Sequence, residues 1–453
     1  MRSFYRLVYL PVLIFFANAL QAQIVSGPML GPVELRTAKL WVEVKPGNSA
    51  DLWYWKKGEM AKAKRLTKKT DVDAWFTPVV FDVVALDVNT SYEYQFIINN
   101  TTNKKPAKAD GSFTTKDLWQ WRKPAPDFSF LTGSCAYINE PPVDRPGKPY
   151  GGDSSIFESM AKEKAAFMLW LGDNWYTRDV DYFDEWGLWN RASHDRSIPV
   201  LQKFLKTTSH FAIWDDHDFG PNDMGKNYIL KNTSRDVFKN YWVNTTYGFN
   251  GQGIYSMMSY SDVDVFMMDD RWWRSADNMA DSVNGKPNPD KKMWGKEQME
   301  WLKNSLLYSK ASFKIIATGS QVLNPVSPFD KLANCPVEYN ELMDFLYANK
   351  INGVLFLSGD RHHTEVIKVN REGTYPLYDI TVSPLTAGTH TFGGTEKNNP
   401  YRVVGIDEKQ NYGKFNFSGA RGQRKLTIEF FGVKGEKLGE WAVGENDLKS
   451  SKK

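Results

Sequence analysis

The chain has 453 residues, of which 42% are hydrophobic, 14% aromatic and 24% charged. This composition excludes a largely disordered protein, and the length predicts two domains with ample core. The 57 basic and 53 acidic residues nearly cancel, which excludes a nucleic-acid partner held by charge.

The first residues have the pattern of a secretory signal peptide. Arg2 and Arg6 precede an apolar run over residues 7–16, and small residues follow up to Ala22. The run is too short for a membrane span, and no cysteine follows the predicted cleavage point to carry a lipid. We therefore expect an exported protein, periplasmic or extracellular, with residues 1–22 removed and no transmembrane anchor.

Residues 23–117 have the pattern of an all-β domain. Apolar and polar residues alternate in AKLWVEV, SADLWYW, PVVFDVVAL and SYEYQFII, with turn residues between them. Short strands at this spacing predict a sandwich of the fibronectin or immunoglobulin type. Because no cluster of acidic, His or Cys residues occurs here, we expect a supporting or substrate-positioning role, with carbohydrate binding through Trp53, Trp55 or Trp75 as the alternative.

A charged, proline-containing segment at residues 116–127 is expected to link this region to an α/β domain over residues 125–453. Apolar periodicity predicts helices at residues 155–165, 199–207, 234–242 and 294–307. Near the end, a hairpin is expected to turn at Lys434 and Gly435. Two other late stretches are expected to be loop-rich or disordered, namely residues 389–419 and 445–453.

Polar residues that can bind metal or phosphate follow several short apolar runs. The stretch FMLWLGDNWY reaches Asp173 and Tyr176 directly after a predicted buried strand. The same pattern recurs in FSFLTGSC, HFAIWDDHD, VDVFMMDDR and GVLFLSGDRHH. Because ligands bind outside the carboxyl ends of strands in open α/β sheets, these repeated endings predict one shared site.

The residues at these endings suit two different metals. A thiolate, a carboxylate, a phenolate and an imidazole form a strongly donating set that favours Fe³⁺: Cys135, Asp173, Tyr176 and His362. A second, all-oxygen set favours Ca²⁺, with Mg²⁺, Mn²⁺ or Zn²⁺ as alternatives: Asp173 as a bridge, Asp216 and Asp360. A disulfide between the two cysteines, Cys135 and Cys335, is the competing explanation in an exported protein.

Two metals that share a carboxylate clamp the oxygens of a phosphoryl group and activate a water molecule, so phosphate-ester hydrolysis is the predicted chemistry. His217 is expected to give a hydrogen bond or proton to the phosphate or leaving oxygen, and Arg271 and Arg274 to hold phosphate oxygens. Asp215 and His363 are expected to orient neighbouring ligands. Helix caps, packed aromatics and salt bridges are the plainer explanations, but three of the six histidines lie at these endings.

The motifs occur in the order found in a known family. The chain resembles the PhoD-like alkaline phosphatases, a branch of the metallophosphoesterase superfamily related to purple acid phosphatases, through GSC at residues 133–135, GDNWY at 172–176, WDDHD at 214–218, MDDRWWR at 268–274, residues 294–316 and SGDRHH at 358–363. The resemblance implies an α/β/β/α sandwich, two β-sheets flanked by helices, after the N-terminal β-sandwich. It also implies Fe³⁺ and Ca²⁺ at the two residue sets above and phosphate at Arg271.

The chain departs from the wider superfamily at three motifs. Residues 135–137 replace an Asp-x-His motif, Asp216 replaces an Asn, and Asp360 replaces the first His of the final motif. The two added carboxylates favour Ca²⁺ over Zn²⁺ at the second site. No His stands near Gly319, so substrate oxygens, water or Gln321 are expected to complete that site.

These observations predict a monomeric, exported alkaline phosphatase that hydrolyses small phosphate monoesters through water activated by two metals. A phosphodiesterase that acts on teichoic-acid-like, phospholipid or nucleotide diesters is one alternative. A secreted glycan-binding protein without catalytic activity is the alternative from another class.

Overall fold

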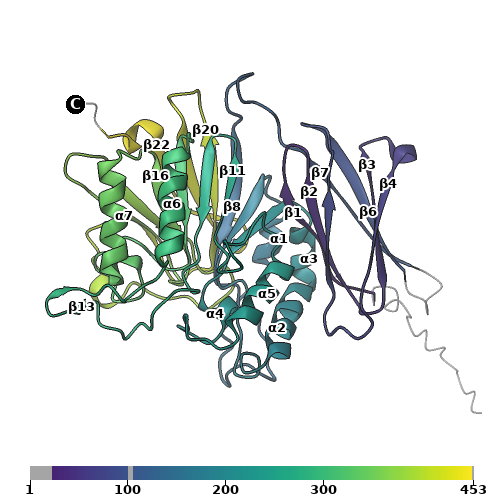
Figure 1. The fold of residues 1–453 in the computed structure, drawn as a ribbon, viewed down its shortest axis with the longest axis horizontal. Coiled ribbons are helices and arrows are strands. Elements are labelled where there is room, and N and C mark those ends of the chain that lie inside the picture. Colours follow the sequence, from purple (N-terminus) through teal and green to yellow (C-terminus); the bar gives the residue numbers. More distant parts are fainter. Residues whose placement is uncertain (1–22, 100–105, 451–453) are drawn as a thin grey trace, which may run out of the picture.

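The computed structural model describes residues 23–99 and 106–450. The predicted signal peptide, residues 1–22, lies outside the described residues. None of the helices described is both long enough and apolar enough to cross a membrane. Most of the chain forms two large β-sheets with helices outside them, and a smaller sheet lies at one end (Figure 1).

The larger sheet has nine strands. Their order across the sheet is β22 (Lys437–Gly444), β21 (Lys425–Gly432), β20 (Asn411–Ser418), β8 (Phe128–Gly133), β9 (Phe167–Leu171), β10 (Ser209–Ile213), β1 (Ile24–Val33), β2 (Ala38–Val44) and β5 (Pro78–Val83). At its centre, β8, β9, β10 and β1 run parallel. Every residue of β9 and β10 is buried, as expected for parallel strands that are covered on both faces.

The second sheet has seven strands. Their order is β11 (Ser256–Tyr260), β12 (Val263–Met267), β15 (Phe313–Ala317), β16 (Val354–Ser358), β18 (Leu377–Thr381), β17 (Thr364–Val369) and β19 (Arg402–Ile406). The two sheets pack through aromatic rings. Between ring centroids, Phe417 of β20 lies 5.2 Å from Phe313 of β15, and Phe167 of β9 lies 5.7 Å from Tyr260 of β11.

Helices lie on the outer sides of this pair of sheets (Figure 1). They are α1 (Ile156–Met160), α2 (Glu185–Ser197), α3 (Pro199–Leu205), α4 (Asp216–Phe219), α5 (Lys231–Tyr241), α6 (Lys296–Tyr308) and α7 (Pro336–Ala348). α6 buries the predicted apolar stripe of Met299, Leu302 and Leu306, and its Trp301 lies against Phe266 of β12. Short elements complete the chain: a hairpin of β13 (Ser282–Val283) and β14 (Lys286–Pro287), and 3₁₀ helices at Met60–Lys62, Leu332–Asn334, Gly394–Glu396 and Glu445–Leu448.

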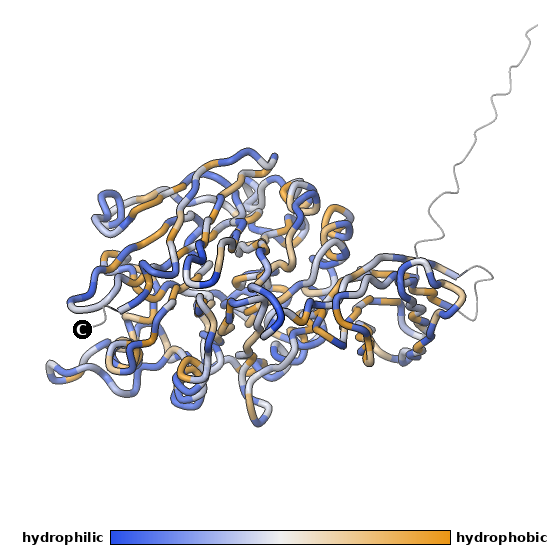
Figure 2. The backbone as a smooth tube through the Cα atoms, turned by 90° about the horizontal axis from the view of Figure 1, so that it is seen from above, coloured by the Kyte–Doolittle hydropathy of each residue, from blue (hydrophilic) through white to orange (hydrophobic). Residues whose placement is uncertain are grey.

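The N-terminal strands form the predicted β-sandwich. β1, β2 and β5 form one side, and a four-stranded sheet forms the other, in the order β4 (Lys64–Lys69), β3 (Ser49–Lys56), β6 (Ser91–Asn99) and β7 (Ala107–Thr114). Figure 2 shows this lobe projecting from one end of the molecule, and most of its buried side chains form a separate core. Because β1 also pairs with β10, the first side of the sandwich continues the nine-stranded sheet. The proposed boundary at residues 117–125 does not divide the two cores cleanly, because Met29 of β1 and Trp41 of β2 belong to the larger core and the nine-stranded sheet contains strands from both sides of the boundary.

Several elements differ from the sequence-based expectation. α2 buries Arg191, Asp195 and Arg196 beside only Leu188 and Ala192 as larger apolar contacts, so hydrophobic periodicity does not reveal it. α7 was not predicted either. Residues 389–419 contain β19 and β20, and the predicted disorder of the tail is wrong for Glu445–Leu448, which forms a 3₁₀ helix.

Candidate metal centre

The carboxyl ends of the central strands meet along one edge of the molecule. β8, β9 and β10 end within one residue of one another in register, and so do β12, β15 and β16. The loops that follow are joined across the two sheets, because Leu385 and Thr386, beyond β18, donate backbone hydrogen bonds to Ser134 and Cys135. The five stretches that carry the predicted site residues therefore converge.

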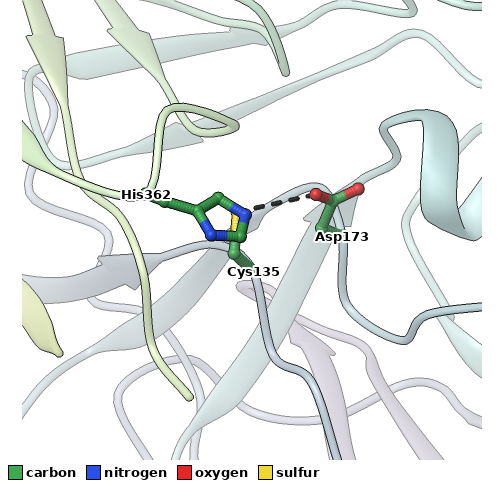
Figure 3. A group of neighbouring side chains, drawn as sticks. All are labelled: Cys135, Asp173 and His362. Atoms are coloured by element: carbon green, nitrogen blue, oxygen red, sulfur yellow. Dashed lines mark hydrogen bonds between the residues drawn. The ribbon is translucent and has the colours of Figure 1, made fainter. Parts of the chain in front are cut away.

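The structure brings together the four residues predicted to bind iron. Cys135 Sγ lies 3.5 Å from Asp173 Oδ2, and the Tyr176 hydroxyl lies 3.1 Å from the same oxygen and 3.1 Å from His362 Nε2. Figure 3 shows the His362 ring beside Cys135 and facing the Asp173 carboxylate. Ligand atoms of Cys135, Asp173 and His362 all lie within 4.8 Å of one another. These donor atoms are close enough to share one cation.

The backbone at the strand ends adopts conformations that most residues avoid. Positive φ angles of 60°, 51°, 64° and 56° occur at Cys135, Asp173, Asp360 and His362. Such left-handed conformations are uncommon for residues other than glycine and concentrate at functional sites. Glycine is required at position 172, directly before Asp173, because its φ is 90° and a Cβ atom there would lie 2.6 Å from Asp215 Cβ.

Burial opposes ionisation of the first donor set. It raises the pKa of the Cys135 thiol to about 12, and it raises the pKa values of Asp173 and Tyr176 well above their usual ranges. The Asp173 carboxylate accepts hydrogen bonds from Cys135, Tyr176 and the His217 backbone, and none of these donors carries a positive charge. A bound cation would supply the charge that these acids need in order to ionise, so the residues fit a metal.

Asp216 and His217 adjoin this set. Ligand atoms of Asp173, Asp216 and His217 lie within 4.8 Å of one another. Burial is the main cause that raises the pKa of Asp360 to about 6, and the charge of Asp216 contributes to the rise. The His217 ring packs on Tyr176 with centroids 4.1 Å apart. The carboxylate oxygens of Asp173 and Asp216 suit a hard cation such as Ca²⁺, whereas Asp360, predicted as the third ligand, is not among the residues of this group.

Arg271 is buried next to these carboxylates. Its Nε donates to Asp215 Oδ1 at 2.5 Å, and its Nη2 pairs with the same oxygen and lies 3.8 Å from Asp216. Asp269 fixes the turn by accepting hydrogen bonds from the backbone of Arg271 and Trp272. The Nη1 group of Arg271 has no hydrogen-bond partner among the described residues. A fixed guanidinium with a free donor suits a phosphate oxygen.

The structure differs from the prediction for Arg274. Its Nε donates to Asp277 at 3.0 Å, and its Nη2 pairs with Asp330. Arg274 lines a small cavity with Cys335, whereas His217 lines another cavity. Because its carboxylate partners lie in loops outside the motifs, the sequence does not distinguish a salt bridge from phosphate binding here.

The expected roles of Gln321 and His363 at the metal sites differ from what the structure shows. Gln321 does not complete the second metal site, because its amide donates to Glu365 and Thr381 at 2.8 Å in a separate buried network. His363 belongs to the same network, with Nε2 3.4 Å from Glu365. The alternative of a disulfide is also wrong, because both cysteines are free and buried.

Three side chains that sequence reasoning did not single out support the site. Ser383 donates to Cys135 Sγ at 3.2 Å, and the Tyr150 hydroxyl lies 3.2 Å from His362 Nδ1. Asp218 accepts hydrogen bonds from the backbone of the GDNWY and WDDHD motifs at 2.9 and 3.0 Å. Ser383 and Asp218 stand at strand endings, so the same pattern points to them, whereas Tyr150 lies in a loop without such a pattern.

Two solved structures share this fold over most of the chain. The structure of PhoD matches with a TM-score of 0.73 at 17% identity and covers 93% of this chain and 89% of that one. Purple acid phosphatase PPD1 from yellow lupin (Lupinus luteus) seeds matches with a TM-score of 0.66 at 10% identity and covers 93% and 76%. The chain therefore shares the fold of PhoD and of this purple acid phosphatase.

A comparison with family models assigns the chain to one family of phosphatases. The model of the PhoD-like phosphatases matches residues 130–430, and the chain belongs to that family. It is 24% identical over 286 residues to alkaline phosphatase D of Bacillus subtilis (strain 168). That match covers 52% of this chain and 46% of the relative, so the chain spans about half the length of the curated relative.

Proposed function

We propose that the protein hydrolyses phosphate esters and prefers monoesters. One observation carries the proposal: a metal-binding donor set and one buried guanidinium with a free N–H group lie together at the carboxyl ends of the strands. Membership of the PhoD-like phosphatase family supports the same chemistry. Export through residues 1–22 is part of the proposal and rests on the sequence pattern alone.

Two cations belong to the proposal. Fe³⁺ would be held by Cys135, Asp173, Tyr176 and His362, and Ca²⁺ by Asp173, Asp216 and Asp360. The soft thiolate beside oxygen and nitrogen donors favours a transition metal in the first set, and the carboxylates favour a hard cation in the second. When bound, the two cations polarise the phosphoryl oxygens and lower the pKa of the attacking water.

The protein's own groups hold the ester and assist its cleavage. Arg271 binds phosphate oxygens, and Asp215 fixes its guanidinium, so little rearrangement is needed when the substrate binds. His217 is fixed by the hydrogen bond from its backbone to Asp173. Its ring gives a hydrogen bond or proton to the leaving oxygen. Arg274 has no part in this proposal, because it pairs with Asp277 and Asp330 and lines a different cavity from His217.

The size of the adjoining space supports a preference for monoesters. The cavity lined by His217 and Tyr176 has a volume of about 300 Å³, near the lower end for small-molecule sites. Such a cavity accommodates one small leaving group. A diester carries a second group that needs space of its own.

Elemental analysis combined with paired substrates tests the proposal. We expect iron and calcium in the purified protein and a higher kcat/KM for 4-nitrophenyl phosphate than for bis(4-nitrophenyl) phosphate. Asp173→Asn is expected to abolish hydrolysis, because the carboxylate serves both cations, whereas Asp82→Asn, an exposed change in β5, serves as the control. No hydrolysis of either ester after loading with iron and calcium would overturn the function, and a pair of zinc ions would overturn only the metal assignment.

A further inference from the structure

The cavity beside the candidate metal centre has a distinctive outer wall. His217 and Tyr176 line its inner side, and the segment from Tyr137 to Tyr150 lines much of the rest. A phosphate ester held by Arg271 and the metals would direct its leaving group into this space. The chemistry of the wall therefore bears on which leaving groups the protein accepts.

Tyrosine rings form the apolar part of the wall. Tyr137 lies 5.0 Å from Tyr150 and 5.0 Å from Tyr176 between ring centroids. Tyr150 is 44% exposed although its hydroxyl contacts His362. The exposed ring of Tyr150 can pack against a flat apolar group, and Tyr137 and Tyr176 support it from behind.

The rim of the cavity carries an excess of positive charge. Arg145, Lys148 and Arg178 line it, together with the two carboxylates Asp144 and Asp179. Arg178 is engaged by Asp144 at 3.0 Å. Neither Arg145 nor Lys148 forms an ion pair with another described residue, and both are exposed. Unpaired cations at the mouth of a cleft attract and orient anions.

The segment that presents these cations is held in place by internal bonds. Asp144 Oδ1 accepts hydrogen bonds from the Tyr137 hydroxyl at 2.7 Å and from Arg178 Nη2 at 3.0 Å, and its Oδ2 accepts one from the Glu140 backbone at 2.6 Å. The Arg178 guanidinium also lies 4.1 Å from the Tyr137 ring centroid. A wall that is ordered in advance loses little conformational entropy when a ligand binds.

We propose that this cavity is the leaving-group subsite and that Arg145 and Lys148 select phosphate esters whose leaving group carries a second negative charge on a flat apolar body. The inference rests on the proposed function and names its substrate class. Tyr150 contacts the body of the leaving group, and the two cations contact its charged end.

A matched pair of aryl phosphates tests the selection. 4-Carboxyphenyl phosphate and 4-carbamoylphenyl phosphate have nearly the same shape but differ by one charge. We expect each of Arg145→Gln and Lys148→Gln to lower the ratio of kcat/KM for the charged over the neutral ester about three-fold, and the double variant to lower it about ten-fold. Lys425→Gln, an exposed change at the start of β21, is the control and is expected to leave the ratio unchanged.

The outcomes separate this inference from the proposed function. An unchanged ratio in the double variant overturns the selection, and so does an equal loss of activity on both esters. Failure of the unaltered protein to hydrolyse either ester overturns the proposed function and the inference with it. As a second readout, raising the salt concentration is expected to reduce the ratio in the unaltered protein and not in the double variant, because salt screens exposed charges.

Discussion

Cys135, Asp173 and Tyr176 are acids that burial disposes to stay protonated, yet they surround one point together with His362. Of these four residues, Cys135, Asp173 and His362 have positive φ angles, which strain the backbone. Arrangements of this kind persist where the surrounding structure holds them and where binding makes use of them. A cation at this point would pair with the ionised forms of these acids and so offset the cost of burying their charges.

Removal of the Tyr176 hydroxyl tests its assignment as a metal ligand. Tyr176→Phe is expected to lose the visible absorption of a phenolate bound to ferric iron, because phenylalanine offers no oxygen. Tyr137→Phe is the matched control, since that hydroxyl donates to Asp144. Visible spectra and iron content of both purified variants are the measurements, and unchanged colour in Tyr176→Phe would contradict the assignment.

The two arginines of the MDDRWWR motif are expected to behave differently. Arg271→Lys is expected to raise KM for 4-nitrophenyl phosphate and to weaken inhibition by inorganic phosphate, each roughly ten-fold, because a charge-assisted hydrogen bond is lost. Arg274→Lys is expected to leave both values within about two-fold, because Asp277 and Asp330 engage Arg274. Steady-state kinetics give KM and the inhibition constant for phosphate, and equal effects of the two changes would show that Arg274 also binds phosphate.

The candidate site was largely predictable because its residues stand directly after buried strands, where sequence position and spatial position are linked. Arg274 and Gln321 broke this rule, since loop residues far away in sequence determine their contacts. The role of Tyr150 was not predictable, because its contact with His362 depends on the path of a loop, and loops have no periodic sequence pattern.

Among the elements, α2 has polar contacts where an apolar face is usual, and these contacts involve Glu43 of β2. The Glu43 carboxylate accepts hydrogen bonds from Ser193 of α2 and Tyr241 of α5, each at 2.8 Å. Burial is the largest influence on Glu43 and raises its pKa to about 7, although these hydrogen bonds and Arg196 oppose the rise. This polar pairing explains why periodicity revealed α3, α5 and α6 but not α2.

Glu43 gives the fold a pH dependence that can be measured. Below its ordinary pKa of 4.5 the carboxyl is protonated in both states, and between 4.5 and about 7 only the folded state keeps the proton. Its contribution to the free energy of unfolding is therefore lost as the pH rises through this window, by roughly 2–3 kcal/mol between about pH 5 and pH 8.

Glu43→Gln isolates this contribution because glutamine does not ionise. Urea unfolding of both proteins at the two pH values is the measurement. The variant is expected to gain stability relative to the unaltered protein as the pH rises, and Glu440→Gln, an exposed change in β22, is the control. A constant difference between the two proteins across this range would contradict a raised pKa at Glu43.

For the whole molecule, strand and helix patterns predicted an N-terminal β-sandwich and an α/β domain, and the family resemblance predicted the pair of sheets, but neither predicted the continuity of the larger sheet. β1 joins β10 through the pair Leu30 and Ser209, a contact between distant segments that leaves no local signal. Ser26 and Trp41 reinforce this junction by donating to the backbone of Arg196 and Asn240 at 2.8 and 2.7 Å. The N-terminal lobe thus completes the sheet that carries the candidate site.

Deletion of the lobe tests how far the two cores depend on each other. A chain that lacks residues 23–115 is expected to unfold without a cooperative transition and to aggregate, because β10 would expose an unpaired edge. Trp53→Ala, in the outer sheet of the lobe, is expected to retain a cooperative transition. Thermal unfolding followed by circular dichroism is the measurement, and a soluble, active truncated chain would instead support an independent domain that begins near residue 125.

The pairing of β20 with β8 has a consequence for how the molecule is made. Phe417 and Phe128 are neighbours in this ladder, so the strand that leads to Cys135 has no partner on one side until the late segment has been synthesised. Contacts between such distant segments slow folding, since a long loop must close before they form. The nine-stranded sheet is therefore incomplete until β20 and the last hairpin have been synthesised, so we expect its final assembly to follow synthesis of the whole chain.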